Sequence, residues 1–210
     1  MFRLDNARIN CVRRGLERLS LDHRRWVSFA FLNTDEVQSL REHAKALPMR
    51  KARRIASYKN HGVFQDFDIC FPAPRAGAIA SLAACLEQGI NRAVGSMSPT
   101  PLSTPVRFDD FAVQRYDAGS DGIGVHRDAA RYRQIVAIVT LAGASRLFAT
   151  AARCNARRVQ INDRPGRIVL LSAPGFAGRE DDKARPFHGV DNVVGGRLSL
   201  GLRISLNEAD

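Results

Sequence analysis

Residues 111–128 read Phe-Ala-Val-Gln-Arg-Tyr-Asp-Ala-Gly-Ser-Asp-Gly-Ile-Gly-Val-His-Arg-Asp, and this stretch decides how the rest of the chain is interpreted. A strand-like run ends at Tyr116, a glycine-rich turn follows, and a second short strand carries His126 and Asp128. Alternate residues of a strand face the same way, so an imidazole and a carboxylate lie side by side there. Two histidines and one carboxylate on one side of a metal ion form a facial site that leaves the other side open. The stretch therefore predicts two of three metal ligands.

The third ligand is predicted to be His188, because it is the only histidine that follows Asp128 in the sequence. It stands in Arg-Pro-Phe-His-Gly-Val, at the expected start of the penultimate strand. By itself, a histidine in this position is more often a hydrogen-bonded core or edge residue, and a His-x-Asp pair also arises readily by chance. The other three histidines lie in the first half of the chain and are interpreted as surface or packing residues: His23, His43 and His61.

The last strand-like run, residues 197–203, reads Arg-Leu-Ser-Leu-Gly-Leu-Arg. Alternation puts three leucines on one face and four other residues on the opposite face: Arg197, Ser199, Gly201 and Arg203. Inward-facing arginines cost free energy unless an anion meets them. A guanidinium binds a carboxylate through two parallel charge-assisted hydrogen bonds, and a neighbouring hydroxyl can add a third. A metal triad beside a buried arginine suits a dicarboxylic 2-oxo acid, since one end chelates the metal and the far carboxylate meets the arginine.

The second half of the chain is predicted to be mainly β, because glycine, proline or charged turns separate most of about eight short strand-like runs. These runs cover 107–116, 123–127, 134–141, 145–149, 157–161, 167–171, 187–190 and 197–206. Residues 134–141 are apolar enough to lie in the middle of a sheet. The pattern is typical of a sandwich or jelly roll.

The first half is predicted to form an α-rich layer, with a strand-like patch at 62–72. Asn33 and Glu36 have the spacing of a capping box and predict a helix near 34–46. An apolar stripe predicts a second helix: Ile79, Leu82, Leu86, Ile90 and Val94. Three prolines mark residues 96–105 as the internal boundary. We therefore expect a helical or substrate-lid region over 1–105 and a jelly-roll core over 106–210.

The chain has 210 residues, a length that suits one domain with a sizeable hydrophobic core. The four cysteines are scattered, which predicts reduced thiols in an intracellular, cytoplasmic protein: Cys11, Cys70, Cys85 and Cys154. No apolar run approaches the length of a membrane span, so no membrane partner is expected. The arginine-rich residues 1–20 lack the apolar core of a secretory signal and are interpreted as an amphipathic segment rather than a transit peptide.

The net charge of +11 favours polyanionic partners, with nucleic acid first among them. The basic cluster at 49–54 suits phosphate binding, and a solvated charged face explains it equally well. Of the 32 basic residues, 28 are arginine, a bias that codon composition also produces without any function.

In combination, the order His-x-Asp, His, Arg-x-Ser resembles that of the iron(II)/2-oxoglutarate-dependent dioxygenases. The fuller pattern is similar to the AlkB-like branch, with Arg-Tyr-x-x-Gly before the His-x-Asp and Arg-x-x-x-x-x-Arg at the end. The resemblance covers roughly residues 106–206. It implies a double-stranded β-helix, or jelly roll, with a helical N-terminal layer. It also implies an enzyme that uses Fe(II), 2-oxoglutarate and O2 to hydroxylate a C–H bond.

The same resemblance assigns roles to eight residues. It places three at the iron: His126, Asp128 and His188. It places five at the cosubstrate. Arg197 would bind the distal carboxylate of 2-oxoglutarate, Ser199 matches the hydroxyl residue of the Arg-x-Ser motif, and Tyr116 matches a tyrosine that forms a hydrogen bond with the cosubstrate. Gln114 stands where the AlkB-like branch usually has Asn, and Arg203 matches the second arginine of that branch. Arg197 and Arg203 are about 20 Å apart along a straight strand, so they cannot share one carboxylate.

Three functions remain open at this point. The first is oxidative demethylation of alkylated nucleic acid, which the basic charge and the order of motifs favour. The second is hydroxylation of a small molecule, an amino acid or a protein side chain, which the absence of an aromatic-rich lid signature favours. The third is a non-catalytic jelly-roll binding protein, which is disfavoured because it leaves Arg197 and Arg203 without inward partners.

Overall fold

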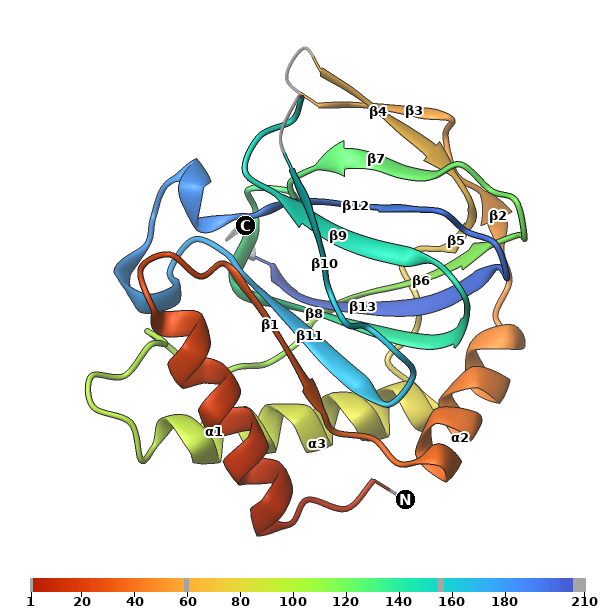
Figure 1. Cartoon of the computed structure of the whole chain (residues 1–210). Coiled ribbons are helices and arrows are strands. Elements are labelled where there is room, and N and C mark those ends of the chain that lie inside the picture. The colour runs from red at the N-terminus through yellow and green to blue at the C-terminus, as the bar shows by residue number, and fades with distance from the viewer. Residues whose placement is uncertain (1, 59–60, 155–156, 206–210) are drawn as a thin grey trace, which may run out of the picture.

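The computed structural model describes residues 2–58, 61–154 and 157–205. Two antiparallel sheets face each other, and three helices pack beneath one of them (Figure 1). This is the mainly β, jelly-roll architecture with a helical layer that the sequence predicted. None of the helices in the described ranges is long and apolar enough to cross a membrane.

The larger sheet has seven strands in the order β1-β11-β8-β13-β6-β5-β2. Their bounds are β1 Trp26–Ala30, β11 Arg167–Ser172, β8 Tyr132–Gly143, β13 Arg197–Ser205, β6 Asp110–Tyr116, β5 Asp68–Cys70 and β2 Arg50–Lys51. The smaller sheet has six strands in the order β10-β9-β12-β7-β4-β3. Their bounds are β10 Arg158–Gln160, β9 Arg146–Thr150, β12 Phe187–Asp191, β7 Gly122–His126, β4 His61–Asp66 and β3 Ile55–Tyr58.

The three helices are α1 Asn6–Ser20, α2 Thr34–Lys45 and α3 Gly77–Val94, and two short 3-10 turns lie at Phe176–Gly178 and Asp182–Ala184. The predicted capping box of α2 is confirmed. The Glu36 backbone N–H donates to Asn33 Oδ1 at 2.9 Å, and the Asn33 backbone N–H donates to Glu36 Oε2 at 3.0 Å. These bonds satisfy two backbone donors that the first turn of a helix otherwise leaves free.

Two cores follow from the alternation of side chains along the strands of the larger sheet. In β8, Ile135, Ala137 and Val139 face the helices, whereas Val136 faces the smaller sheet. The leucines of β13 belong to the helix-facing core: Leu198, Leu200 and Leu202. The other face of β13 therefore points between the sheets, as its alternation predicted.

The first half of the chain contributes more strand than the sequence analysis expected. β1 pairs with β11 and β5 pairs with β6, so strands from before residue 105 complete the larger sheet, and β3 and β4 extend the smaller one. The segment 96–105 is a loop that follows all three α-helices, and strands from both sides of it belong to the same two sheets. β1 is a five-residue edge strand with only two buried side chains, which is too short a pattern to recognise in a sequence.

Candidate metal centre

The predicted metal ligands meet on two neighbouring strands. His126 ends β7, His188 lies near the start of β12, and the two are directly opposite each other in the strand pair. Asp128 follows two residues after His126. One ligand atom from each of the three lies within 4.8 Å of the others, and His188 Nε2 is 3.7 Å from Asp128 Oδ2. The structure thus brings together all three residues, including the one chosen by its position in the sequence.

The approach of β7 to β12 depends on Gly122, where β7 begins. Its φ is +81°, a conformation that favours glycine. A Cβ atom at this position would lie 2.0 Å from the carbonyl oxygen of Val190 in β12. The glycine-rich turn in residues 111–128 therefore allows the strand that carries His126 to lie against the strand that carries His188.

Backbone carbonyls fix the orientation of both imidazoles. Nδ1 of His126 lies 2.9 Å from the Gly124 carbonyl oxygen, and Nδ1 of His188 lies 3.1 Å from the Pro186 carbonyl oxygen. A carbonyl oxygen only accepts, so each Nδ1 carries the proton and donates it. Each Nε2 is left as a lone-pair donor that faces the centre, which is the usual arrangement of a metal-binding histidine.

The electrostatics of the centre favour the protonation state that a divalent cation needs. Burial and, to a smaller extent, the neighbouring His188 lower the pKa of His126 to about 4, against the opposing effect of Asp128. Burial alone would raise the pKa of Asp128, but His188, Arg203 and His126 hold it below its ordinary value. At neutral pH the centre therefore offers a neutral His126 and an ionised carboxylate.

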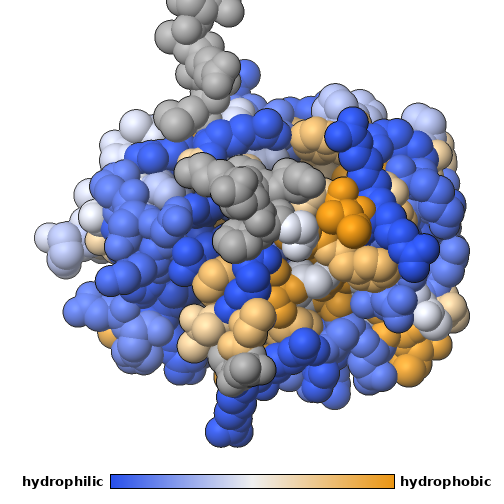
Figure 2. Space-filling view, turned by 90° about the horizontal axis from the view of Figure 1, so that it is seen from above, coloured by the Kyte–Doolittle hydropathy of each residue, from blue (hydrophilic) through white to orange (hydrophobic). Residues whose placement is uncertain are grey.

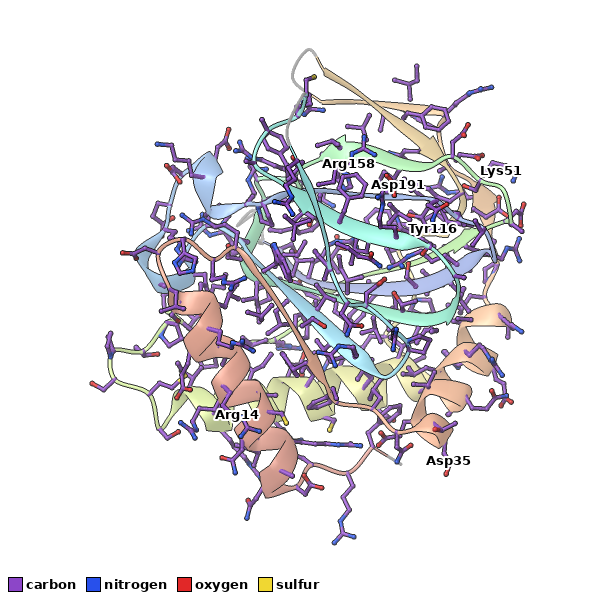
Figure 3. The ribbon with its side chains drawn as sticks, viewed as in Figure 1. Arg14, Asp35, Lys51, Tyr116, Arg158 and Asp191 are labelled. Atoms are coloured by element: carbon purple, nitrogen blue, oxygen red, sulfur yellow. The ribbon has the colours of Figure 1, made fainter. Side chains whose placement is uncertain are left out.

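A cavity of about 40 Å³ adjoins the triad between the two sheets, and all eight residues singled out in the sequence line it. The four inward residues of β13 form one wall, and β6 contributes Gln114 and Tyr116. The rest of the lining is apolar: Ile123, Val136, Ile138, Leu147 and Val190. Figure 3 shows Tyr116 near the middle of the molecule, whereas Lys51 of the basic cluster lies at its edge.

Arg203 reaches the metal end of this cavity. A Cβ atom on Gly201 would lie 3.0 Å from Arg203 Nη2, so the guanidinium lies directly over that glycine. Arg203 Nη1 is 3.3 Å from Asp110 Oδ1, and Nε is 4.0 Å from Asp128 Oδ1. Its Nε is buried and has no hydrogen-bond partner in the described chain.

Arg197 occupies the opposite end and has a counter-charge that the sequence analysis missed. Its Nη1 donates to Asp163 Oδ2 and, at 3.1 Å, to Ser145 Oγ. Thr140 Oγ1 donates to the same Asp163 oxygen at 2.7 Å. Arg197 Nε is also buried and has no hydrogen-bond partner in the described ranges. Asp163 lies in an Asn-Asp-Arg-Pro turn, whose sequence is typical of a surface turn. The sequence contained one indirect signal for such a residue, namely that a buried arginine needs a counter-charge.

Tyr116 lies between the two arginines. Burial raises the pKa of its hydroxyl well above the ordinary value, although Arg197 and Arg203 both act to lower it. The hydroxyl therefore stays protonated, and it lies 3.4 Å from Gln114 Oε1, to which it donates. Tyr116 has one O–H hydrogen, which it can donate to a ligand in the cavity in place of Gln114, but it cannot act as an anion there.

The remaining sequence candidates lie apart from the centre. The ring of His43 packs over Gly77, and His23 is exposed. The side chain of His61 lies outside the described residues. In the basic cluster, Lys51 Nζ pairs with Asp68 Oδ1 at 3.0 Å, and none of residues 49–54 lines the cavity.

Comparison with known proteins gives matches by structure only. No protein-family model matches the chain, and no curated protein does. A prolyl-4-hydroxylase from Pseudomonas putida matches with a TM-score of 0.62 at 17% identity, over 93% of this chain and 99% of that one. A prolyl hydroxylase from Trichoplax adhaerens, in complex with a hypoxia inducible factor peptide fragment, matches with a TM-score of 0.66 at 14% identity, over 95% and 90%. A 2OG-Fe(II) oxygenase family protein from Burkholderia pseudomallei matches with a TM-score of 0.58 at 15% identity, over 97% and 93%.

The chain therefore has the jelly-roll fold of the 2-oxoglutarate- and Fe(II)-dependent oxygenases. Within that fold it is similar to structures of prolyl hydroxylases. The AlkB-like branch that the order of motifs suggested is not confirmed by these comparisons. Nor do they support the nucleic-acid substrate that the net charge suggested.

Proposed function

We propose that this chain is an Fe(II)- and 2-oxoglutarate-dependent dioxygenase that hydroxylates a C–H bond of a protein side chain or a small molecule. The observation that carries this proposal is the cavity beside the His-Asp-His triad. Arg197 and Arg203 lie at the two ends of one wall of this cavity, and the Nε atom of each is buried and has no hydrogen-bond partner in the described chain. A dicarboxylic 2-oxo acid would satisfy both donors, because it places one carboxylate at the metal and the other at the far arginine.

The residues present fit the metal that this fold implies. Nε2 of His126, Nε2 of His188 and a carboxylate oxygen of Asp128 would bind Fe(II), since two imidazoles and one carboxylate on one face are typical of non-haem iron oxygenases. When bound, the metal supplies O2 activation, which couples conversion of 2-oxoglutarate to succinate and carbon dioxide with hydroxylation of the substrate.

The chain's own side chains would bind and orient the cosubstrate. Arg197 would donate Nε–H to the distal carboxylate while its Nη1 stays on Asp163. The hydroxyl groups of Ser199 and Tyr116 line the same cavity and can donate beside it. Arg203, next to Asp128, would face the carboxylate at the metal end. The apolar side chains of the cavity exclude water from the reacting groups.

The neighbouring structures and the surface support this choice of substrate class. The similar structures are of prolyl hydroxylases, one of them with a peptide, which favours a protein side chain or small molecule. Recognition of flipped or single-stranded bases uses exposed aromatic rings for stacking. Among the residues whose exposure the structure describes, the exposed large hydrophobic side chains are aliphatic: Leu21, Ile55, Val159 and Val194.

The test combines binding with turnover. We expect Fe(II) and 2-oxoglutarate together to give succinate, and anaerobic calorimetry to show one Fe(II) site that is lost in His126→Ala, Asp128→Ala and His188→Ala. Asp117→Asn is the matched control, because this carboxylate is 76% exposed and lies outside the cavity. Metal binding that survives all three changes, in variants that keep their circular dichroism spectrum, would sink the proposal.

A further inference from the structure

A second groove, of about 560 Å³, lies beside the metal centre and is lined by basic side chains. Six arginines and lysines line it, and no aspartate or glutamate does among the described residues: Arg24, Arg25, Arg127, Arg157, Lys183 and Arg185. The groove runs between Trp26 of β1 and Val159 of β10. β1 and β10 are edge strands of the two sheets (Figure 1).

The floor of the groove is built from the same segments that hold the metal ligands. Arg127 stands between His126 and Asp128 in the chain. Arg185 Nη1 donates to the backbone carbonyl of Asp128. Pro186, which also lines the groove, provides the carbonyl that orients His188. A molecule that occupies the groove therefore lies next to the metal centre.

The positive charge of the groove is only partly offset by the protein. Arg185 is 4% exposed, and the Nε atoms of Arg127 and Arg185 are both buried with no hydrogen-bond partner in the described ranges. Asp182 contacts Arg185 and lies 3.8 Å from Arg127, so one carboxylate serves two guanidiniums. Buried guanidiniums in such surroundings gain free energy when an anion meets them.

We propose that this groove binds an acidic peptide segment that flanks the hydroxylated residue, and this inference rests on the proposed function. Carboxylate side chains would pair with the six cations, and Val159, which is 47% exposed, would contact apolar side chains of the peptide. Edge strands such as β1 and β10 also present backbone groups that pair with an extended peptide. The groove thereby adds a sequence preference to a centre that by itself recognises only a C–H bond.

The aromatic residues of the groove argue against a nucleic acid as its occupant. The ring of Phe187 is covered by Arg127, whose guanidinium carbon is 4.0 Å from the ring centroid, and Arg153 lies at 5.6 Å. Trp26 packs against the core between the sheets. Arg127 thus occupies a face of the Phe187 ring and Trp26 is partly buried, whereas carboxylates need only the guanidiniums and the lysine.

The test uses three exposed rim residues that form no ion pair with the described part of the chain: Arg24, Arg157 and Lys183. The triple variant Arg24→Glu, Arg157→Glu, Lys183→Glu leaves the metal ligands and the cavity untouched. A fluorescent peptide with a central proline flanked by glutamates is titrated by anisotropy at low salt, in parallel with the glutamine-flanked peptide and a single-stranded oligonucleotide. Arg14→Glu is the control, because Arg14 is exposed on α1 and outside the groove (Figure 3).

We expect the triple variant to bind the acidic peptide at least about tenfold more weakly, from three reversed surface charges. Equal binding of the two peptides, or an unchanged affinity in the triple variant, would overturn the inference. Tighter binding of the oligonucleotide than of the acidic peptide, lost in the same variant, would overturn it in favour of nucleic acid. Succinate formed without any peptide is measured separately, so its absence counts against the proposed enzyme and leaves the groove to be judged by binding.

Discussion

Asp163→Asn is the most informative change in the cavity, because Asp163 already holds the arginine that the cosubstrate needs. Its Oδ2 accepts from Arg197 and from Thr140, and all three residues are buried. A carboxylate of 2-oxoglutarate on the Nε edge of Arg197 would place two negative charges around one guanidinium. Asparagine keeps the shape and the hydrogen-bond acceptor of Asp163 but removes the competing charge.

The size of the effect follows from the charge separation. Two carboxylates on different edges of one guanidinium lie roughly 6 Å apart, and at an effective dielectric constant of about 20 their repulsion is about 3 kcal/mol. Asp163 also lines a solvent-accessible cavity of about 680 Å³ on its other side, and water there screens part of this repulsion. We therefore expect Asp163→Asn to tighten 2-oxoglutarate binding by about 2 kcal/mol, roughly 30-fold in the half-saturating concentration.

The variant should also show a compensating loss of stability without the cosubstrate. Removing one partner of a buried ion pair costs about 3 kcal/mol, since it leaves Arg197 with an uncompensated charge. 2-Oxoglutarate would replace that charge, so it should raise the melting temperature of Asp163→Asn more than that of the natural protein.

The assay measures succinate against 2-oxoglutarate concentration, together with thermal unfolding with and without the cosubstrate. Asp191→Asn is the matched control, because Asp191 pairs with Arg146 at 2.6 Å and with Arg158, and it does not line the cavity (Figure 3). An Asp163→Asn half-saturating concentration equal to that of the natural protein or higher, in a folded variant, would refute the idea that Asp163 competes with the cosubstrate.

Three further predictions concern the cavity and the helical layer. Arg197→Leu should raise the half-saturating 2-oxoglutarate concentration by the equivalent of about 2–4 kcal/mol, and an unchanged value in the succinate assay would exclude Arg197 as the anchor. Gly201→Ala should shift the Arg203 guanidinium by a few tenths of an ångström, since the new Cβ lies 3.0–3.3 Å from three of its atoms. Calorimetry should then show weaker 2-oxoglutarate binding, and unaltered binding would contradict this placement. Glu36→Gln should cost about 1–3 kcal/mol of stability at pH 7. Burial opposes ionisation of Glu36, but Arg8 and the Asn33 backbone hold its pKa below 4.5, so its contribution is present above that pH and disappears as pH falls through the lowered value. Urea unfolding across pH 3–7 would show a constant gap between the two proteins if this is wrong.

The sequence was most informative where a regular spacing of residue types, such as strand alternation or a capping box, defines the local structure. Alternation in residues 197–203 was enough to separate the leucines from Arg197 and Arg203, and the capping box located the start of α2. The triad could be assembled because alternation puts His126 and Asp128 on one side, although β7 ends at His126 and Asp128 lies two residues beyond it, and because only one later histidine exists.

What the sequence left out depends on long-range contacts. Asp163 meets Arg197 from a turn 34 residues away, and nothing in that turn differs from a solvated one. The same holds for the groove, where Arg24 and Arg157, just ahead of β1 and β10, meet Arg127, which follows the end of β7. The face of the molecule in Figure 2 is largely hydrophilic. The arginines are spread along the whole sequence, so their positions alone did not distinguish this groove.

Because the two faces of β13 have different roles, this strand cannot gain or lose a single residue without loss of structure. Deleting one residue ahead of Leu198 would move every following side chain to the opposite face, so leucines would enter the cavity and arginines would enter the helix-facing core. Such a deletion removes the cosubstrate site and the hydrophobic core in a single event. The two-residue edge strand β2 is exposed at both positions and contributes neither to the cosubstrate site nor to the hydrophobic core. A one-residue deletion in β2 should therefore be tolerated far better. Length variation among natural relatives should therefore accumulate around β2 and be absent from β13.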